Sequence, residues 1–273
     1  MAVTQGRDGA GTEMSFRPQL VALDIDGTIV DHSQVLTDDV RAAVRRVCDA
    51  GVPVVLTTGR AWPGTETLFE VLGLPPGPSV CANGAQIIDY PPLVVRHEER
   101  FDPADTIARA SRLAPEVTLA VQDGLNWRVS RPFPDGELTG NVTVESLEEL
   151  ASRPVSRVVL RDPGSSDDAF QRMVESLGLH EVSYFIGWSA WVDIAPLGVD
   201  KARGLALVCR DLGVAAADVL AVGDGRNDIE MLRWAGRGVA MGESPEGVRA
   251  AADHVTGGVA DGGLVTELSR WFP

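Results

Sequence analysis

The chain contains little cysteine. Its 273 residues include three, Cys48, Cys81 and Cys209, which are widely spaced and form no C-x-x-C pair. Two disulfide bridges would need a fourth cysteine, so a small scaffold held by several disulfides is excluded. We therefore expect reduced, mostly buried thiols and a cytoplasmic location.

Long apolar runs and an excess of positive charge are also missing. No apolar stretch reaches the roughly 20 residues that span a bilayer. Residues 1–18 are Gly-rich and polar and lack the apolar segment of a secretory signal, so we expect a disordered tail or an over-long start there. The formal net charge of −15 argues against nucleic acid or an anionic membrane as the partner.

The most informative segment is Asp24-Ile25-Asp26-Gly27-Thr28, which follows an apolar run. Such a run, ending in acidic residues and a glycine, predicts a buried strand with carboxylates at its carboxyl end. In open α/β sheets, ligands bind at that edge. Because side chains alternate along a strand, Asp24 and Asp26 begin on the same face. Two close carboxylates repel each other, and a divalent cation such as Mg²⁺ relieves the repulsion.

This segment has two other interpretations, a calcium loop and a strand-end turn without chemistry. An EF-hand loop needs an acidic or Asn side chain two residues after the second Asp, and a Glu at its twelfth position. Thr28 and Val35 occupy these two places, which excludes the calcium loop. The turn remains open for this segment taken alone.

Similar strand ends recur along the chain. An apolar run precedes Thr58-Gly59-Arg60, whose hydroxyl and backbone N–H groups could donate to a phosphate. Another precedes Asn83-Gly84, a turn signal that also offers amide donors. Lys201, a lone lysine, opens an apolar-periodic helix, and a further apolar run leads into Gly223-Asp224-Gly225-Arg226-Asn227-Asp228.

In this order, the DxDGT, TGR, lysine and GDGxND segments resemble the motifs of the haloacid dehalogenase-like (HAD) phosphatases. The long middle segment is similar to the Cof-type branch, in which a type IIB cap is inserted after the second motif. The resemblance covers about residues 19–272, with two small departures: Ile29 stands where Leu is usual, and Asp200 precedes the lysine. It implies a Mg²⁺-dependent phosphatase that hydrolyses a small phosphorylated metabolite, a sugar phosphate or a nucleotide-like phosphate, through an aspartyl-phosphate.

The resemblance also implies a role for each matching residue. Asp24 would be the nucleophile, Asp26 the general acid and base, and Lys201 the cation that neutralises Asp24 and the phosphate. The Mg²⁺ site would consist of Asp24, the Asp26 carbonyl oxygen, Asp224 and the supporting Asp228. The substrate would contact Thr58, Gly59, Arg60, Asn83, Gly84 and Asn227.

Several of these residues also have a purely structural interpretation. A lysine at a helix start is by itself usually solvated, and Asp224 and Asp228 could be a loop residue and a helix N-cap. Arg60 could bind substrate or pair with a surface acid, and both remain open. Three tryptophans of the middle segment favour an aromatic core over a substrate platform: Trp127, Trp188 and Trp191.

The order of elements predicts an α/β fold. Strands and helices alternate over residues 19–84 and again over 197–273, which indicates a doubly wound, parallel, Rossmann-like sheet. Residues 85–196 instead predict an inserted α+β cap with a hairpin, two helices and several strands. We expect a discontinuous catalytic core with this cap between its halves, and the resemblance implies that the cap covers the catalytic site.

Two alternatives to a phosphatase remain. A phosphomutase forms the same aspartyl-phosphate, and a non-hydrolytic regulatory protein could keep the site for binding alone. A pure binder has no evident need for an acid/base Asp, which favours an enzyme. The cap contains no nameable recognition motif, so the substrate and the oligomeric state are not predicted. Its polar candidates are Arg96, Asn126, Arg128 and Arg131.

Overall fold

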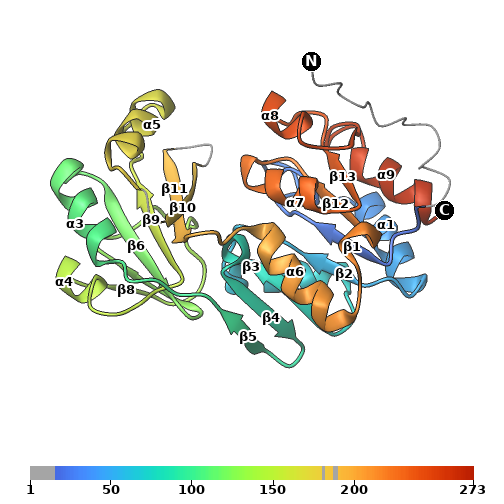
Figure 1. Ribbon diagram of the computed structural model, residues 1–273, viewed down its shortest axis with the longest axis horizontal. Helices are drawn as coiled ribbons and strands as arrows, with labels where there is room; N and C mark the ends of the chain where they lie inside the picture. Colours follow the sequence, from blue (N-terminus) through green and yellow to red (C-terminus); the bar gives the residue numbers. More distant parts are fainter. Residues whose placement is uncertain (1–15, 180–181, 187–189) are drawn as a thin grey trace, which may run out of the picture.

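The computed structural model describes residues 16–179, 182–186 and 190–273. The chain forms two lobes, and the first and last described residues lie on the same one (Figure 1). A parallel sheet covered by helices forms the core lobe, and a separate, mostly antiparallel sheet forms the cap lobe. The predicted fold class, α/β with a Rossmann-like core and an inserted α+β cap, is confirmed.

The core sheet contains five parallel strands in the order β14-β13-β12-β1-β2. β1 lies between β2 and β12, and Leu23 pairs with Leu56 on one side and with Val222 on the other. The residues that follow β1 and β12 therefore meet at one edge of the sheet. The strands are β1 (Leu20–Leu23), β2 (Val54–Leu56), β12 (Val219–Gly223), β13 (Arg237–Ala240) and β14 (His254–Val255).

Helices bury both faces of this sheet, which is why β1 is apolar at every position. Val21 and Leu23 pack on the side of α1, α2 and α9, whereas Leu20 and Ala22 pack on the side of α6, α7 and α8. The helices are α1 (Asp38–Asp49), α2 (Glu66–Leu72), α6 (Lys201–Leu212), α7 (Ile229–Trp234), α8 (Glu246–Arg249) and α9 (Gly263–Trp271). Short 3₁₀ turns at 62–64, 82–84, 216–218 and 226–228 complete this lobe.

A three-stranded sheet extends the core at its β2 side. It consists of β3 (Gly77–Cys81), β4 (Gln86–Tyr90) and β5 (Val94–Glu98), paired antiparallel in that order. A parallel bridge between Thr57 and Val80 joins β3 to the end of β2. We expected the hairpin after residue 85 to belong to the cap, but it pairs with the last strand of the first core half. The division at residues 84/85 and 196/197 stays a prediction.

The cap sheet has the order β10-β11-β9-β6-β7-β8. Its strands are β6 (Thr118–Asp123), β7 (Asn126–Val129), β8 (Val142–Val144), β9 (Arg157–Arg161), β10 (Val182–Ile186) and β11 (Trp191–Pro196). Three helices cover one face: α3 (Ala104–Leu113), α4 (Leu147–Leu150) and α5 (Asp167–Ser176). Because side chains alternate along β9, Val158 and Leu160 face those helices. Arg157, Val159 and Arg161 lie on the opposite face.

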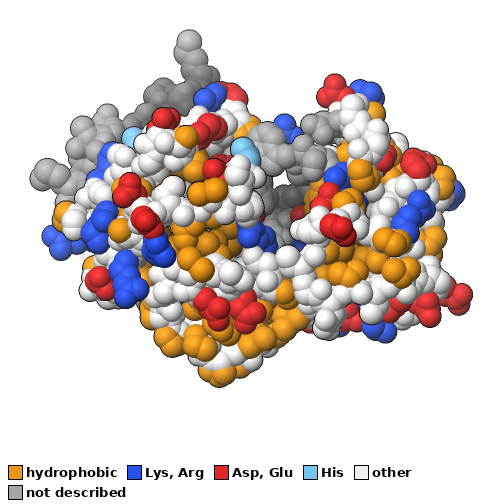
Figure 2. Space-filling model, turned by 180° about the vertical axis from the view of Figure 1, so that it is seen from behind, with side chains coloured by type: hydrophobic (Ala, Val, Ile, Leu, Met, Phe, Trp, Pro, Cys, Tyr) orange, Lys and Arg blue, Asp and Glu red, His pale blue; other side chains and the backbone are white. Residues whose placement is uncertain are grey.

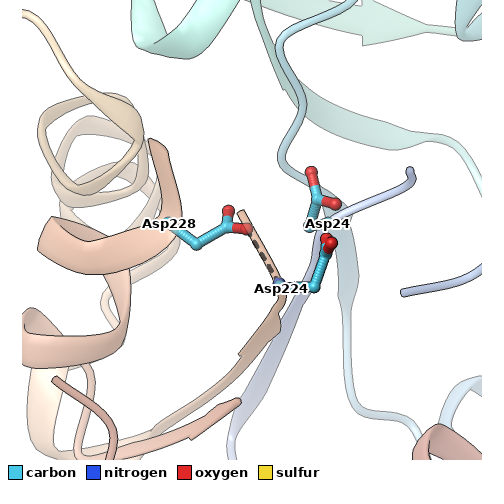
Figure 3. Close-up of side chains that lie close together, drawn as sticks. All are labelled: Asp24, Asp224 and Asp228. Carbon is cyan, nitrogen blue, oxygen red and sulfur yellow. Dashed lines mark hydrogen bonds between the residues drawn. The ribbon is translucent and has the colours of Figure 1, made fainter. Parts of the chain in front are cut away.

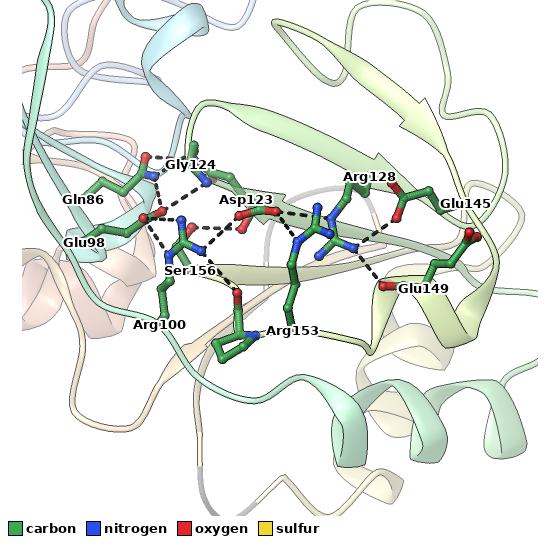
Figure 4. A network of polar contacts seen from close by, with 12 residues as sticks. Gln86, Glu98, Arg100, Asp123, Gly124, Arg128, Glu145, Glu149, Arg153 and Ser156 are labelled. Atoms are coloured by element: carbon green, nitrogen blue, oxygen red, sulfur yellow. Dashed lines mark hydrogen bonds and ion pairs between the residues drawn. The ribbon is translucent and has the colours of Figure 1, made fainter.

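Where the lobes join, a polar network connects the β4–β5 hairpin to the β6–β7 turn (Figure 4). Gln86 donates to Glu98 and to the Gly124 carbonyl oxygen, and the Gly124 N–H donates to Glu98. Arg100 then bridges Glu98 and Asp123, which also pairs with Arg153. The network fixes the turn of the cap against the core hairpin.

The described helices are all too short or too polar to cross a bilayer.

Candidate active site

Three predicted carboxylates converge at the carboxyl edge of the core sheet (Figure 3). Asp24 follows β1, Asp224 follows β12, and Asp228 reaches back from the turn before α7. One oxygen from each lies within 4.8 Å of the others, and all three residues are buried. The neighbouring positions of β1 and β12 in the sheet explain why residues 200 apart in sequence meet here.

Lys201 balances two of these carboxylates. Its Nζ donates to Asp24 Oδ1 and to Asp228 Oδ1, at 2.6 Å each. Lys201 is fully buried, so it is not the solvated helix-start lysine of the structural interpretation. The Asp200 side chain caps α6 by accepting the Arg203 N–H, which places Lys201 at the first helical position. Burial lowers the pKa of Lys201, but the charges of Asp228 and Asp24 and their hydrogen bonds outweigh it and raise the pKa, so Lys201 stays protonated.

Asp228 also holds the turn that carries Asp224. Its Oδ2 accepts the backbone N–H groups of Asp224 and Gly225 at 3.0 and 2.8 Å, while Oδ1 accepts from Lys201. The carboxylate can approach because Gly223 has no Cβ: a methyl there would lie 2.5 Å from Asp228 Cγ. Both oxygens of Asp228 therefore bond to the protein, whereas Asp224 Oδ1 has no hydrogen-bond partner among the described residues.

Burial and mutual repulsion raise the pKa values of the other two carboxyls. The pKa of Asp24 lies well above its ordinary value because burial outweighs the neighbouring Lys201. The pKa of Asp224 is raised to about 7 by burial and by the charge of Asp228. Within the described structure, Asp224 Oδ1 is buried and has no hydrogen-bond partner. A hard dication facing Asp24 and Asp224 would remove this cost, so the residues present fit a Mg²⁺ ion.

Gly27 makes the approach of Asp224 to β1 possible. Its φ is +86°, and a Cβ at this position would lie 2.2 Å from Asp224 Oδ2. Both the left-handed backbone and the close carboxylate require glycine. The glycine of the DxDG motif is therefore needed for the close approach of the Asp224 carboxylate, which belongs to the GDGxND motif.

The Asp26 side chain lies apart from the three buried carboxylates. Arg60 donates from Nε to Asp26 Oδ2 at 2.8 Å and from Nη2 to Oδ1 at 2.5 Å, and Gln34 donates to Oδ1 at 2.9 Å. Hydrogen bonds and charge from Arg60 outweigh burial and lower the pKa of Asp26. Arg60 also donates to the Gly64 carbonyl oxygen. Of its two interpretations, pairing with an acid is the one observed, and that acid is Asp26.

The residues expected to contact substrate divide into two groups. Gly59, Arg60, Asn83 and Asn227 line one cavity with Asp24, Asp26 and Asp224. Asn227 Nδ2 donates to Asn83 Oδ1 at 2.9 Å, which joins the two motifs.

Thr58 and Gly84 lie behind this cavity surface. Thr58 is fully buried, and its Oγ1 accepts the Arg60 N–H at 3.0 Å. A Cβ on Gly84 would lie 1.9 Å from the Asp200 carbonyl oxygen. Gly84 therefore permits the start of α6 to pack close and thereby positions Lys201.

The cavity has a volume of about 770 Å³ and lies between the two lobes, where the surface is hollowed (Figure 2). Its cap wall includes Trp127, Arg157, Trp191 and Asp193, of which the sequence analysis named only the two tryptophans, as core. The signal for the others was a charged residue within a buried, alternating strand: Arg157 in β9 and Asp193 in β11.

The four polar cap candidates lie elsewhere. Arg96 pairs with Asp89 and Asp211, and Arg128 is buried against Glu145. Arg131 donates to backbone carbonyl oxygens of residues 115 and 116, and the Asn126 side chain accepts from Asn141. None of the four lines the cavity described above, and Trp188 falls outside the described residues.

Comparison with known proteins agrees with this geometry. The model of the haloacid dehalogenase-like hydrolase family matches residues 21–268. The chain belongs to the haloacid dehalogenase-like hydrolases. This confirms the family that the motifs predicted, and it makes the chain a HAD-family phosphatase of the Cof type.

Named relatives and solved structures align with nearly the whole chain. The chain is 30% identical over 254 residues to the 5-amino-6-(5-phospho-D-ribitylamino)uracil phosphatase YcsE of Bacillus subtilis, covering 93% of this chain and 95% of that one. It is 29% identical over 265 residues to the pyridoxal phosphate phosphatase YbhA of Escherichia coli, covering 88% and 93%. The HAD phosphatase BT1666 of Bacteroides thetaiotaomicron superposes with a TM-score of 0.76 at 26% identity, covering 97% and 99%.

Proposed function

We propose that this HAD-family phosphatase hydrolyses a small phosphorylated metabolite through an aspartyl-phosphate on Asp24, with Mg²⁺ as cofactor. The observation that carries the proposal is the environment of Asp24. Its Oδ1 is held by a fully buried Lys201, and a second carboxylate with an unpartnered oxygen, Asp224, lies beside it. A buried carboxylate oriented by a cation and facing a cavity suits nucleophilic attack on phosphorus.

In the first step, an Asp24 oxygen forms a bond to phosphorus and the ester P–O bond to the leaving group breaks. Asp26 gives its proton to the departing alkoxide. In the second step, Asp26 takes a proton from water, whose oxygen attacks the same phosphorus and releases Asp24 and inorganic phosphate. Arg60 now occupies both oxygens of Asp26. Asp26 must therefore separate from Arg60 and take up a proton from solvent before it can protonate the leaving group.

The remaining residues neutralise and position charge. Lys201 stabilises both the Asp24 carboxylate and the negative charge on the phosphoryl oxygens. Such positioning and charge stabilisation are the main requirements of phosphoryl transfer. Asp228 holds Lys201 and the turn of Asp224, and Asn227 with the backbone at Thr58 and Gly59 would orient the phosphate. A Mg²⁺ ion held by Asp24, Asp224 and the Asp26 carbonyl oxygen would supply further charge stabilisation.

Phosphatases of two small metabolites among the relatives support a metabolite as the substrate. The cavity volume of about 770 Å³ suits a substrate of that size. We also propose a cytoplasmic location, because Cys48, Cys81 and Cys209 are all free thiols.

The test is phosphate release from a panel of phosphorylated metabolites, with Mg²⁺ and with EDTA, alongside the Asp24→Asn variant. Mg²⁺-dependent release by the wild type that the variant lacks would support the proposal. Transfer of phosphate between sugar phosphates without release would indicate a mutase instead. Binding of esters without either reaction would indicate a regulatory protein.

A further inference from the structure

The cap wall of the cavity combines aromatic surface with negative charge. Alternation along β9 and β11 sends Arg157, Trp191 and Asp193 to the face opposite the cap helices, and Trp127 joins them from β7. Leu138 adds apolar surface, and Glu137 and Asp168 add two further carboxylates. In the proposed function the phosphate lies with the core motifs, so the leaving group of the ester would lie along this wall.

Arg157 is the one cation that the described cap residues bring to this wall, and its nitrogens are committed to the protein. Nη1 donates to the Gly59 carbonyl oxygen and, at 3.0 Å, to Asp193 Oδ1, while Nε and Nη2 donate to Gln122 Oε1 at 3.1 and 2.8 Å. Its guanidinium also lies over the Trp127 ring. Cap residues 180–181 and 187–189, which the structure does not describe, contain neither Lys nor Arg.

Asp193 is held in place by groups from both lobes. Arg157 of the cap donates to its Oδ1, and Asn83 of the core donates to its Oδ2 at 3.3 Å. A carboxylate has about four acceptor sites. Asp193 lines the cavity with 13% of its side chain exposed, so it can also accept from a donor in the cavity.

The two sides of the cavity therefore differ in charge, and the cap side is the more negative. On the core side, the carboxylates of Asp24, Asp26 and Asp224 face the cations Arg60 and Arg226 and the proposed Mg²⁺ site. On the cap side, the carboxylates of Glu137, Asp168 and Asp193 face one cation, Arg157. Glu137 is paired with Arg161, but Asp168 is exposed to solvent. A substrate that is anionic at both ends would place its second anion against these carboxylates, and the described residues that line the cavity include no uncommitted cap cation.

We propose that the cap selects phosphate monoesters whose leaving group is uncharged or cationic, donates an N–H or O–H hydrogen bond to Asp193, and has an apolar or planar face for Trp191 and Leu138. The inference rests on the proposed phosphatase function and narrows its substrate class. An amine-bearing or hydroxylated ring alcohol fits these requirements. A leaving group with a carboxylate or a second phosphate does not, which also argues against a mutase of bisphosphorylated sugars.

The test compares three esters that share one ring and one phosphate: pyridoxamine 5′-phosphate, pyridoxine 5′-phosphate and 4-pyridoxic acid 5′-phosphate. They present an amine, a hydroxyl and a carboxylate at the same position. We expect kcat/KM for the amine and the alcohol to exceed that for the carboxylate by at least about tenfold, on the order of one partly screened charge interaction. Equal values, or preference for the carboxylate, would overturn the inference.

Variants of the cap carboxylates test whether their charge, rather than the shape of the cavity, selects the substrate. Asp193→Asn removes the charge and keeps an acceptor oxygen, and we expect the amine-to-carboxylate ratio of kcat/KM to fall about tenfold. This ratio does not depend on how much of the sample is folded. Asp168→Asn, at an exposed position, should lower the ratio by a smaller factor. Asp105→Asn is the matched control, because Asp105 lies on α3 outside the cavity lining and pairs with Arg109.

The outcomes distinguish the two proposals. Release of phosphate from 4-nitrophenyl phosphate with no charge preference among the three esters would overturn this inference and leave the phosphatase function standing. No release from any ester would overturn the phosphatase function itself. If both cavity variants keep the wild-type ratio, the cap carboxylates do not select the substrate.

Discussion

Replacing Lys201 with alanine tests the electrostatic role of this residue. The ammonium is fully buried between Asp24 and Asp228, with both Nζ–O distances at 2.6 Å. Its removal leaves two buried carboxylates without their cation, a type of change that costs about 3–5 kcal/mol of folding free energy. Losing one preorganised charge in the transition state costs about 3–4 kcal/mol, or roughly 10²–10³-fold in kcat. The pKa of Asp24 would also rise further, because Lys201 is the main influence that lowers it.

The assay is kcat at saturating Mg²⁺ together with thermal unfolding of the metal-free protein. Arg203→Ala is a matched control, because Arg203 follows on the same helix and pairs with the partly exposed Glu99. Lys201 is the chain's single lysine, so ¹³Cε-lysine labelling gives one side-chain signal, which should not titrate where an exposed lysine does. A Lys201→Ala variant within twofold of wild type in kcat would refute the reasoning.

Three further predictions concern the metal site and Asp26. The pKa of Asp224 is about 7 in the folded protein against 3.8 for an unfolded Asp, so its protonation stabilises the metal-free fold below about pH 4. This stabilisation is lost as the pH rises through 7. Mg²⁺ should therefore raise Tm more at pH 8 than at pH 6, and an equal increase at both pH values would contradict this. Gly27→Ala should weaken Mg²⁺ binding and cost about 1–3 kcal/mol of stability, whereas Gly51→Ala, with φ +77° and open space around it, should cost stability alone; similar Mg²⁺ affinity in both variants would count against the contact with Asp224. Arg60→Gln should raise the pKa of Asp26. The decline of kcat/KM at high pH, which marks the loss of the proton that Asp26 donates, should then move to higher pH. An unchanged pH profile would show that the ion pair with Arg60 does not set the pKa of Asp26.

The sequence predicted the core of the site because that part depends on local rules. A buried parallel strand must be apolar, so the first acidic residue after β1 and after β12 marks the carboxyl edge of the sheet. Asp24 and Asp224 could be placed at that edge from pattern alone. Lys201 could not be, since only the packing of α6 against Gly84 brings it between the carboxylates.

Other features depend on contacts that have no local pattern. The hairpin β4–β5 is evident from its alternation and its Pro-Pro turn, but its pairing with β3 is a tertiary choice. In the cap, β8 has three residues, all of them exposed, and α4 is a single turn, so neither gives a periodic signal. The pairing of Arg60 with Asp26 likewise depends on where the Arg60 side chain lies relative to the end of β1.

The central claim is that Asp24 carries the phosphoryl group. The most direct measurement is acid quench of the enzyme during turnover of a good ester, followed by mass spectrometry of the peptide that contains Asp24. We predict a phosphoryl adduct on Asp24 that disappears when turnover ends, and neither adduct nor phosphate release with Asp24→Asn. Continued phosphate release by Asp24→Asn, or an adduct on another residue, would contradict the account.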